Sequence, residues 1–202
     1  EKDFSSDLIV WEGSFGVENK ELKMGYANLE GDKEMIKRYL LSKGVKEENL
    51  VFTAVKTRAQ SKRNYSVDGK YIGDEFTAYE LKQSILIESH EVDKIEKISR
   101  EITELLNKGV NLYSRSPRYY YTKLADLKIE MISKATEDAR LRAEKIAEFS
   151  GGKLGKIVSA KMGVFQITGQ NSNEDYSWGG TFNTSSKEKT ASITMKLVYD
   201  ID

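Results

Sequence analysis

Apolar residues recur at helical spacing in three stretches of the chain. The first runs from residue 19 to residue 42, and Gly31 is expected to weaken or bend it. Its predicted inner face consists of Leu22, Tyr26, Leu29, Ile36 and Leu40. The second begins near Asp93, with a predicted buried stripe of Ile95, Ile98, Ile102, Leu105 and Leu106. Both stretches end in a Lys-Gly-Val sequence, which closes two similar strand–helix–strand segments.

The third helical stretch spans residues 121–150 and carries a ridge of small residues. The ridge consists of Leu124, Leu127, Met131, Ala135, Ala139, Ala143 and Ala147. Because alanine is small, this ridge lets the helix lie close to a sheet or another helix. Gly151 or Gly152 is predicted to end the helix in the left-handed conformation.

Strand-like stretches separate these helices. They lie at residues 7–17, 50–55, 76–88, 111–121, 156–168 and 190–201. Asp68-Gly69 is a strong signal for a two-residue hairpin turn. The last two stretches are predicted to pair antiparallel, and a polar insertion at 170–189 separates them. An insertion of this length is too long for a simple hairpin turn.

The order of elements predicts an α+β fold class. Residues 7–122 read β-α-β-β-α-β, the split βαβ pattern of ferredoxin-like folds. Residues 121–202 add the long helix and the terminal antiparallel strand pair with its insertion at 170–189. We expect the two parts to form one domain that spans residues 1–202.

Composition excludes several classes of protein. Lys plus Arg and Asp plus Glu both number 32, so no net charge attracts nucleic acid or an anionic membrane. The chain has no cysteine, which excludes disulfides, thiolate metal sites and a cysteine nucleophile. No apolar run approaches the roughly 20 residues that span a bilayer, so no transmembrane segment is expected. The chain begins at Glu1, which favours an upstream targeting segment that has been removed.

No motif indicates a catalytic, metal or cofactor site. The glycines of SGGKLGK (150–156) follow a helix, whereas a phosphate-binding loop needs them ahead of one. His90 is the single histidine, and its acidic neighbours lack the spacing of metal ligands. A solvated strand–helix junction is the preferred interpretation of that segment. Carboxylates that meet only in the fold would leave a hydrolase as a third, weaker possibility.

Aromatic residues in polar segments are the candidate interaction surface. Basic groups and tyrosines mix in RSPRYYYTK (115–123), but the neutral chain argues against nucleic acid. The insertion 170–189 holds further aromatics with little local core around them, and such side chains often anchor contacts. The alternative is that they fold back onto the domain or a neighbouring subunit. The candidate residues are Tyr176, Trp178, Phe182, Tyr119 and Tyr120.

The stretch ATEDARLRAEKIAEFSGGKLGKI (135–157) resembles the SIMPL-domain family. Similar segments are LLSKGVKEENLVFT and TAYELKQSILIESHEVDKIEKI, so the resemblance covers about residues 20–168. Bacterial members of this family include periplasmic immunogenic proteins and proteins linked to oxidative-stress defence. The resemblance implies an extracytoplasmic α+β protein, often a homo-oligomer, with no agreed reaction. The motifs that carry the resemblance are packing motifs, so the resemblance assigns no active-site residues to this chain.

These observations favour a non-enzymatic protein of the cell envelope that acts by homo-oligomerisation or by binding a partner. A glycan- or peptide-binding module that uses the loop 170–189 is the alternative hypothesis. Both hypotheses need no cofactor.

Overall fold

The computed structural model describes residues 1–201, and the chain forms two compact units. Unit 1 combines Glu1–Asp7 with the chain from Arg118 onward, and unit 2 is Leu8–Pro117. The predicted division at residues 121–122 lies close to the observed boundary after Pro117. Residues Lys2–Ser5 pair antiparallel with Glu188–Ala191 near the other end of the chain, which the sequence pattern does not indicate.

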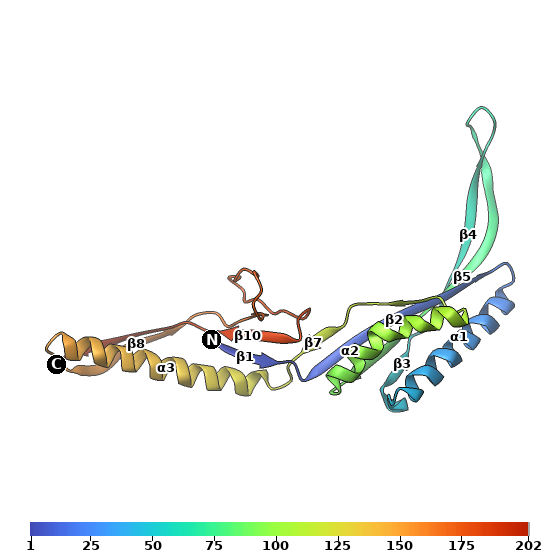
Figure 1. Cartoon of the computed structure of the whole chain (residues 1–202). Coiled ribbons are helices and arrows are strands. Elements are labelled where there is room, and N and C mark those ends of the chain that lie inside the picture. The colour runs from blue at the N-terminus through green and yellow to red at the C-terminus, as the bar shows by residue number, and fades with distance from the viewer. Residues whose placement is uncertain (202) are drawn as a thin grey trace. The chain divides into compact units, whose positions relative to one another are not determined.

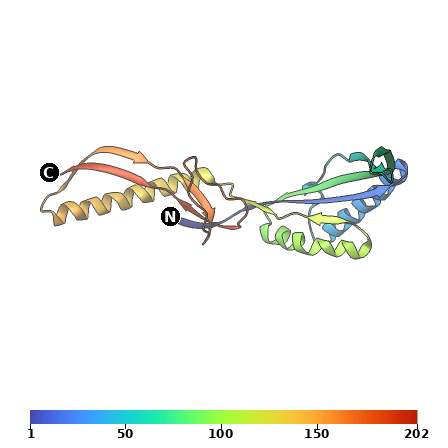
Figure 2. The same ribbon diagram turned by 90° about the horizontal axis from the view of Figure 1, so that it is seen from above.

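Unit 2 has the β-α-β-β-α-β order that the sequence predicts, with the second strand in two pieces. Its elements are β2 (Leu8–Asn19), α1 (Leu22–Ser42), β3 (Leu50–Phe52), β4 (Lys56–Tyr65), β5 (Tyr71–Ser89), α2 (Val92–Glu101) and β6 (Leu112–Ser114). The sheet order is β3-β5-β2-β6 with antiparallel neighbours, which is the split βαβ order. Both helices contact β2 and β5 and cover one face of this sheet (Figures 1 and 2).

The strands β4 and β5 continue past the sheet as a two-stranded arm (Figure 1). The turn at its tip contains Asp68-Gly69, as predicted, and Gly69 has a φ of 76°. This left-handed conformation is one that glycine adopts without strain.

The core of unit 2 follows from the alternation along β2. Ile9, Trp11 and Phe15 point to the helices and are buried, while the residues between them point to the other face. Trp11 fits because Gly13 has no side chain: a Cβ there would lie 2.9 Å from the indole ring. The Trp11 indole N–H donates to Ser114 Oγ at 3.0 Å, so the buried ring has its polar partner.

The predicted inner faces of two helices are wrong in part. Leu22 and Tyr26 are exposed, because Gly25 is the position of that helical turn that contacts the sheet. Leu106 is 63% exposed, because α2 continues as a 3-10 helix over Ile102–Lys108 and its tighter winding turns this residue outward. The helix α1 runs without a break through Gly31 to Ser42.

Unit 1 contains one long helix and two small sheets. Its elements are β1 (Lys2–Ser5), β7 (Arg118–Tyr120), α3 (Leu124–Phe149), β8 (Leu154–Met162), β9 (Gln166–Gly169), β10 (Glu188–Ser192) and β11 (Met195–Ile201). One sheet has the order β1-β10-β9 and the other consists of β8 and β11. The two predicted strands at 156–168 and 190–201 do pair antiparallel, but each is divided between these sheets.

The helix α3 packs through the ridge that the sequence predicts. Leu127, Met131 and Ala147 are buried, and the remaining ridge residues are half-buried. Leu127 and Met131 contact Ile167 and Ala191, which form the core beside the three-stranded sheet. Gly151, with a φ of 82°, follows the C-cap of the helix, so the predicted helix stop is confirmed.

Candidate functional site

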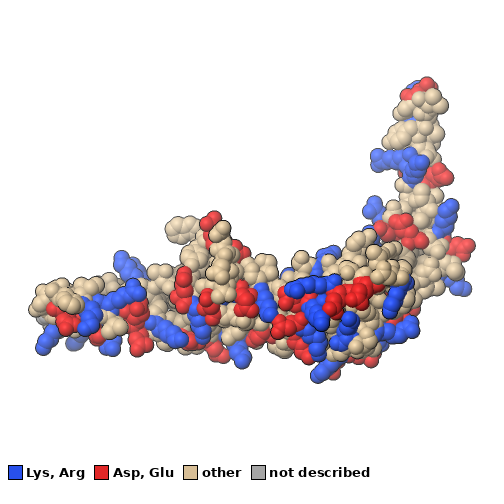
Figure 3. Space-filling view, in the orientation of Figure 1, with Lys and Arg blue, Asp and Glu red and all other residues tan. Residues whose placement is uncertain are grey.

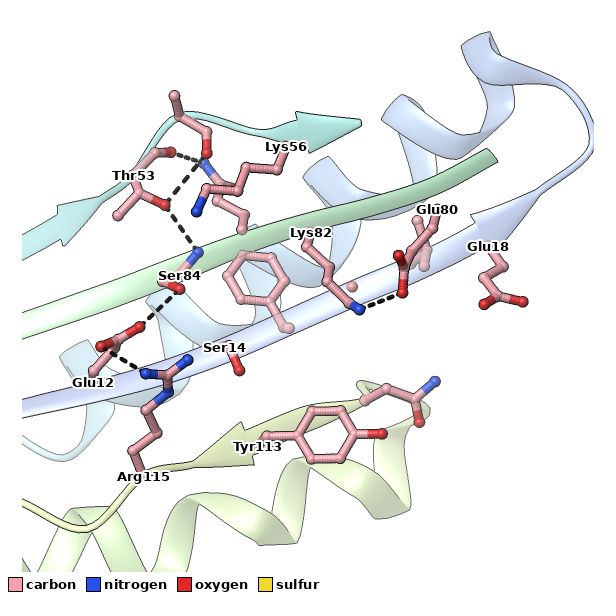
Figure 4. A pocket seen from close by; sticks show the side chains of 16 residues that line it. Glu12, Ser14, Glu18, Thr53, Lys56, Glu80, Lys82, Ser84, Tyr113 and Arg115 are labelled. Atoms are coloured by element: carbon pink, nitrogen blue, oxygen red, sulfur yellow. Dashed lines mark hydrogen bonds and ion pairs between the residues drawn. The ribbon is translucent and has the colours of Figure 1, made fainter. Parts of the chain in front are cut away.

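The uncovered face of the unit 2 sheet forms a polar groove. Its volume is about 860 Å³, and residues of β2 and β5 line it together with the β3–β4 connection and residues after α2 (Figure 4). The charged residues of the groove are Glu12, Glu18, Glu80, Lys56, Lys82 and Arg115. None of these was a candidate from the sequence, because alternation along a strand predicts only that such residues face water.

Hydrogen bonds and ion pairs link most charges of this groove. Ser84 Oγ donates to Glu12 at 3.2 Å, and Arg115 lies 3.5 Å from the same carboxylate. Lys82 forms an ion pair with Glu80. Thr53 joins the β3–β4 connection to β5, since its Oγ1 accepts from the Ser84 amide at 3.0 Å. The groove is therefore an open, charge-compensated polar face, with no preference for an anion or a cation.

In unit 1, the insertion between β9 and β10 is built around a buried lysine. Lys189 is only 2% exposed, and its ammonium group donates to the Asn183 carbonyl oxygen at 2.7 Å and to the Ser186 carbonyl oxygen at 2.6 Å. A third contact joins it to Asn183 Oδ1 at 3.2 Å. Burial lowers the pKa of Lys189 to about 8, because desolvation disfavours the charged form, while nearby Glu174 acts in the opposite direction.

Glu174 holds the first half of the same loop. Its carboxylate accepts from the Gly169 amide at 2.8 Å and from Asn183 Nδ2 at 2.5 Å. The pKa of Glu174 is lowered, first by the Gly169 amide and then by Asn183, since hydrogen bonds to a carboxylate favour its charged form. Glu174 and Lys189 thus hold Asn183 from two sides.

Gln166 fixes the middle of the loop. This buried side chain donates to the Ser177 carbonyl oxygen at 2.8 Å and accepts from the Thr181 amide at 2.5 Å. The segment between those two contacts contains Trp178. The loop is therefore cross-linked by side chains of β9 and β10, although it contains almost no regular secondary structure.

The loop presents most of its aromatic residues to solvent. Trp178 is fully exposed, and Tyr176 and Phe182 are also exposed. Tyr176 donates to Glu1 at 3.2 Å, and Phe182 forms an isolated bridge to Ile167. Of the two candidates outside the loop, Tyr119 is buried and Tyr120 is half-buried, because alternate residues of β7 point to opposite sides. The three loop aromatics are therefore exposed, whereas Tyr119 offers no exposed surface.

A second exposed surface in unit 1 is apolar, and the sequence pattern does not predict it. We call the second half of α3 together with β8 and β11 the α3–β8–β11 layer (Figures 1 and 2). Phe149 is 89% exposed, although it lies beside the helix stop. The other exposed apolar residues of this layer are Leu141, Ile146, Ile157, Val158, Met162, Val198 and Ile201.

The layer has too few elements to bury these side chains. Its sheet has two strands, and a pair of strands is marginal in water unless a helix or further strands cover it. Alanines of α3 supply much of the packing against it, so little apolar area is buried. In Figure 3 positive and negative side chains are interspersed over the face shown of each unit.

The chain belongs to the SIMPL family, which is described as a protein of unknown function (DUF541). The match covers residues 1–199 and thus extends well beyond the motifs at 20–168. This family is not known as enzymatic. A comparison with curated proteins finds no match to the chain. Among residues 1–201, no helix is long and apolar enough to cross a membrane.

Proposed function

We propose that this protein acts by associating with copies of itself in an extracytoplasmic compartment, without catalysing a reaction. The observation that carries the proposal is the apolar surface of the α3–β8–β11 layer. Exposed apolar surface beyond scattered single residues commonly marks a site of protein association. The location outside the cytoplasm rests on the family alone, and fractionation of cells that express the full gene product tests it.

A second copy of the chain is the partner that the composition favours. Equal numbers of cationic and anionic residues give a net charge of zero and a pI of about 6.9. A chain without net charge is not repelled by its own copies near neutral pH. On the face shown in Figure 3 the two signs of charge are interspersed, which does not favour a strongly charged partner there.

Light scattering on the purified chain tests the proposal. We expect a mass that is a multiple of 23.0 kDa and that falls on dilution. A mass of one chain at the highest concentration would refute self-association.

Two isoleucines of α3 give a matched pair of variants. Ile146 lies in the layer and Ile129 lies near the start of the helix, yet both are 66% exposed. Ile146→Lys should reduce the associated fraction, whereas Ile129→Lys should leave it unchanged. Equal effects of both variants would mean that the layer is not the interface.

The loop at 170–187 supports a second candidate function, recognition of a glycan or a peptide. The observation that favours it is a fully exposed tryptophan on a loop that buried side chains hold in place. A fixed loop loses little entropy when it binds, and aromatic rings stack on sugars and peptides. Tryptophan fluorescence in a ligand screen should respond in the native chain and not in Trp178→Ala. A ligand that binds both proteins alike would exclude the loop as its site.

A further inference from the structure

The edge strand β11 has a sequence that reads alike from both ends. Its residues are Met-Lys-Leu-Val-Tyr-Asp-Ile, with Val198 at the centre. Residues at equal distances from Val198 match: two apolar ends, then Lys196 and Asp200 with opposite charges, then Leu197 and Tyr199. Such a strand can pair with a second copy of itself in antiparallel orientation, because antiparallel pairing reverses the order of residues.

One edge of β11 is free to pair. β8 occupies the other edge, and no strand of residues 1–201 pairs on the outer side. The pairing register between β8 and β11 shifts at two places, and at both the extra residue lies in β8. Val158, for example, has no residue of β11 opposite it. A bulged strand makes a poor pairing edge, whereas the regular β11 makes a good one.

The hydrogen-bonding direction of β11 fits this pairing. The Gly163 amide donates to the Thr194 carbonyl oxygen at 2.8 Å, so the backbone hydrogen-bonding groups of Thr194 point toward β8. Backbone groups alternate in direction along a strand, and those of Leu197 and Tyr199 therefore face the open edge. In the register centred on Val198, Leu197 of each copy meets Tyr199 of the other, and these two residues exchange both hydrogen bonds.

The same register gives partners to two charged side chains, Lys196 and Asp200, that have none among residues 1–201. Lys196 stands opposite Lys161 of β8, which is an unfavourable pair of like charges. Neither Lys196 nor Asp200 has an ion pair within residues 1–201. In the two-fold register each Lys196 lies opposite Asp200 of the second copy, which gives two ion pairs. A register centred on Lys196 would instead place two lysines together.

We infer that two copies of this chain join edge to edge through β11, in the antiparallel register centred on Val198. The two-stranded sheets then merge into one four-stranded sheet of order β8-β11-β11-β8, with a self-complementary interface. The inference rests on the proposed self-association and specifies its interface.

Cysteine cross-linking tests the register, because the chain has no cysteine of its own. Val198 would meet itself in a non-hydrogen-bonded pair, where the Cα atoms lie about 4.5 Å apart, within the range of a disulfide. V198C should therefore form a disulfide-linked dimer under mild oxidation. V158C, at an exposed valine in the bulged strand β8, is the control and should stay monomeric on a non-reducing gel. Rapid cross-linking of V158C instead of V198C would overturn the inference and place the interface at β8.

Charge exchange tests the paired residues. K196E and D200K each turn both ion pairs of the interface into pairs of like charges, and each should weaken association by about tenfold or more. The double variant K196E/D200K should restore it, and so should an equimolar mixture of the two single variants. If the native chain associates but neither substitution weakens it, the β11 register is wrong while self-association stands. If the native chain is monomeric, both proposals fail.

Discussion

The buried ammonium group of Lys189 donates to both oxygen atoms of Asn183, at 2.7 Å to the backbone oxygen and at 3.2 Å to Oδ1. Asn183 also donates to Glu174, so a lysine of β10 and a glutamate of the loop meet on one asparagine. A positive charge that is almost fully buried is uncommon, because its removal from water is costly unless it has partners. Here three oxygen atoms surround it, and they hold the insertion against the three-stranded sheet.

Replacing Lys189 with methionine should therefore destabilise unit 1. The variant removes the costly buried charge but leaves two backbone carbonyl oxygens without their donor, each a loss of about 1–3 kcal/mol. We expect a net decrease of about 2 kcal/mol in the free energy of unfolding. Urea denaturation followed by circular dichroism measures it. Lys153→Met, at an exposed position of the same unit, is the control and should be nearly neutral.

The lowered pKa of Lys189 predicts how stability changes with pH. Below about pH 8 the side chain is charged in both the folded and the unfolded chain. Between about pH 8 and the ordinary value of 10.5, the unfolded chain binds this proton more tightly, so stability rises with pH. The native chain should therefore gain about 2 kcal/mol over Lys189→Met between pH 7.5 and pH 9.5, at about 1.4 kcal/mol per pH unit at most. A constant or shrinking difference between the two proteins would contradict the lowered pKa.

The sequence predicts the helices and strands of this fold better than it predicts how they pack against one another. Hydrophobic periodicity and turn-forming residues are local properties of the sequence. The alanine ridge of α3 and the turn at Asp68-Gly69 could therefore be predicted from neighbouring residues. Gly25 could not, because its partner Leu81 is far away in the chain and belongs to another element. For the same reason the hydrophobic pattern predicts Tyr26 on the inner face of α1, whereas Gly25 lies against the sheet in that helical turn.

The candidate sites divide in a similar way. The loop aromatics could be predicted because an aromatic residue in a polar segment is visible in the sequence. The burial of Lys189 could not be predicted, because a lysine near serines is expected to be exposed to solvent. Only the fold places three oxygen atoms around its ammonium group. The apolar surface of the α3–β8–β11 layer was missed because its strands have ordinary apolar patterns. Only the sheet topology reveals that these strands have too few neighbours to be covered.

Two glycines of α1 should respond in opposite ways to alanine. A Cβ at Gly25 would lie 2.8 Å from Leu81 Cδ1, closer than carbon atoms approach one another, whereas a Cβ at Gly31 would meet nothing within 4 Å. Alanine in a helix is favoured over glycine by about 0.8–1.0 kcal/mol. Gly31→Ala should therefore stabilise the protein by up to about 1 kcal/mol, and Gly25→Ala should destabilise it by about 1–2 kcal/mol through overpacking. Thermal unfolding of both variants compares them directly, and stabilisation by Gly25→Ala would show that α1 does not lie this close to β5.

The two tryptophans of the chain occupy opposite environments, and their fluorescence should separate them. Trp11 is fully buried in unit 2 and Trp178 is fully exposed in unit 1. In Trp178→Phe only the buried indole remains, so its emission should be blue-shifted and resist quenching by acrylamide. The native chain should in contrast show a second, red-shifted component that acrylamide quenches readily.

The same measurement tests whether association covers the loop. The interface centred on Val198 does not involve Trp178, so quenching of the native chain should not change as the associated fraction falls on dilution. Quenching that increases on dilution would mean that subunits cover Trp178, and the loop would then be part of an interface between copies. Quenching that is weak at every concentration would instead show that Trp178 folds back onto its own unit, which would remove the basis for glycan or peptide recognition by this loop.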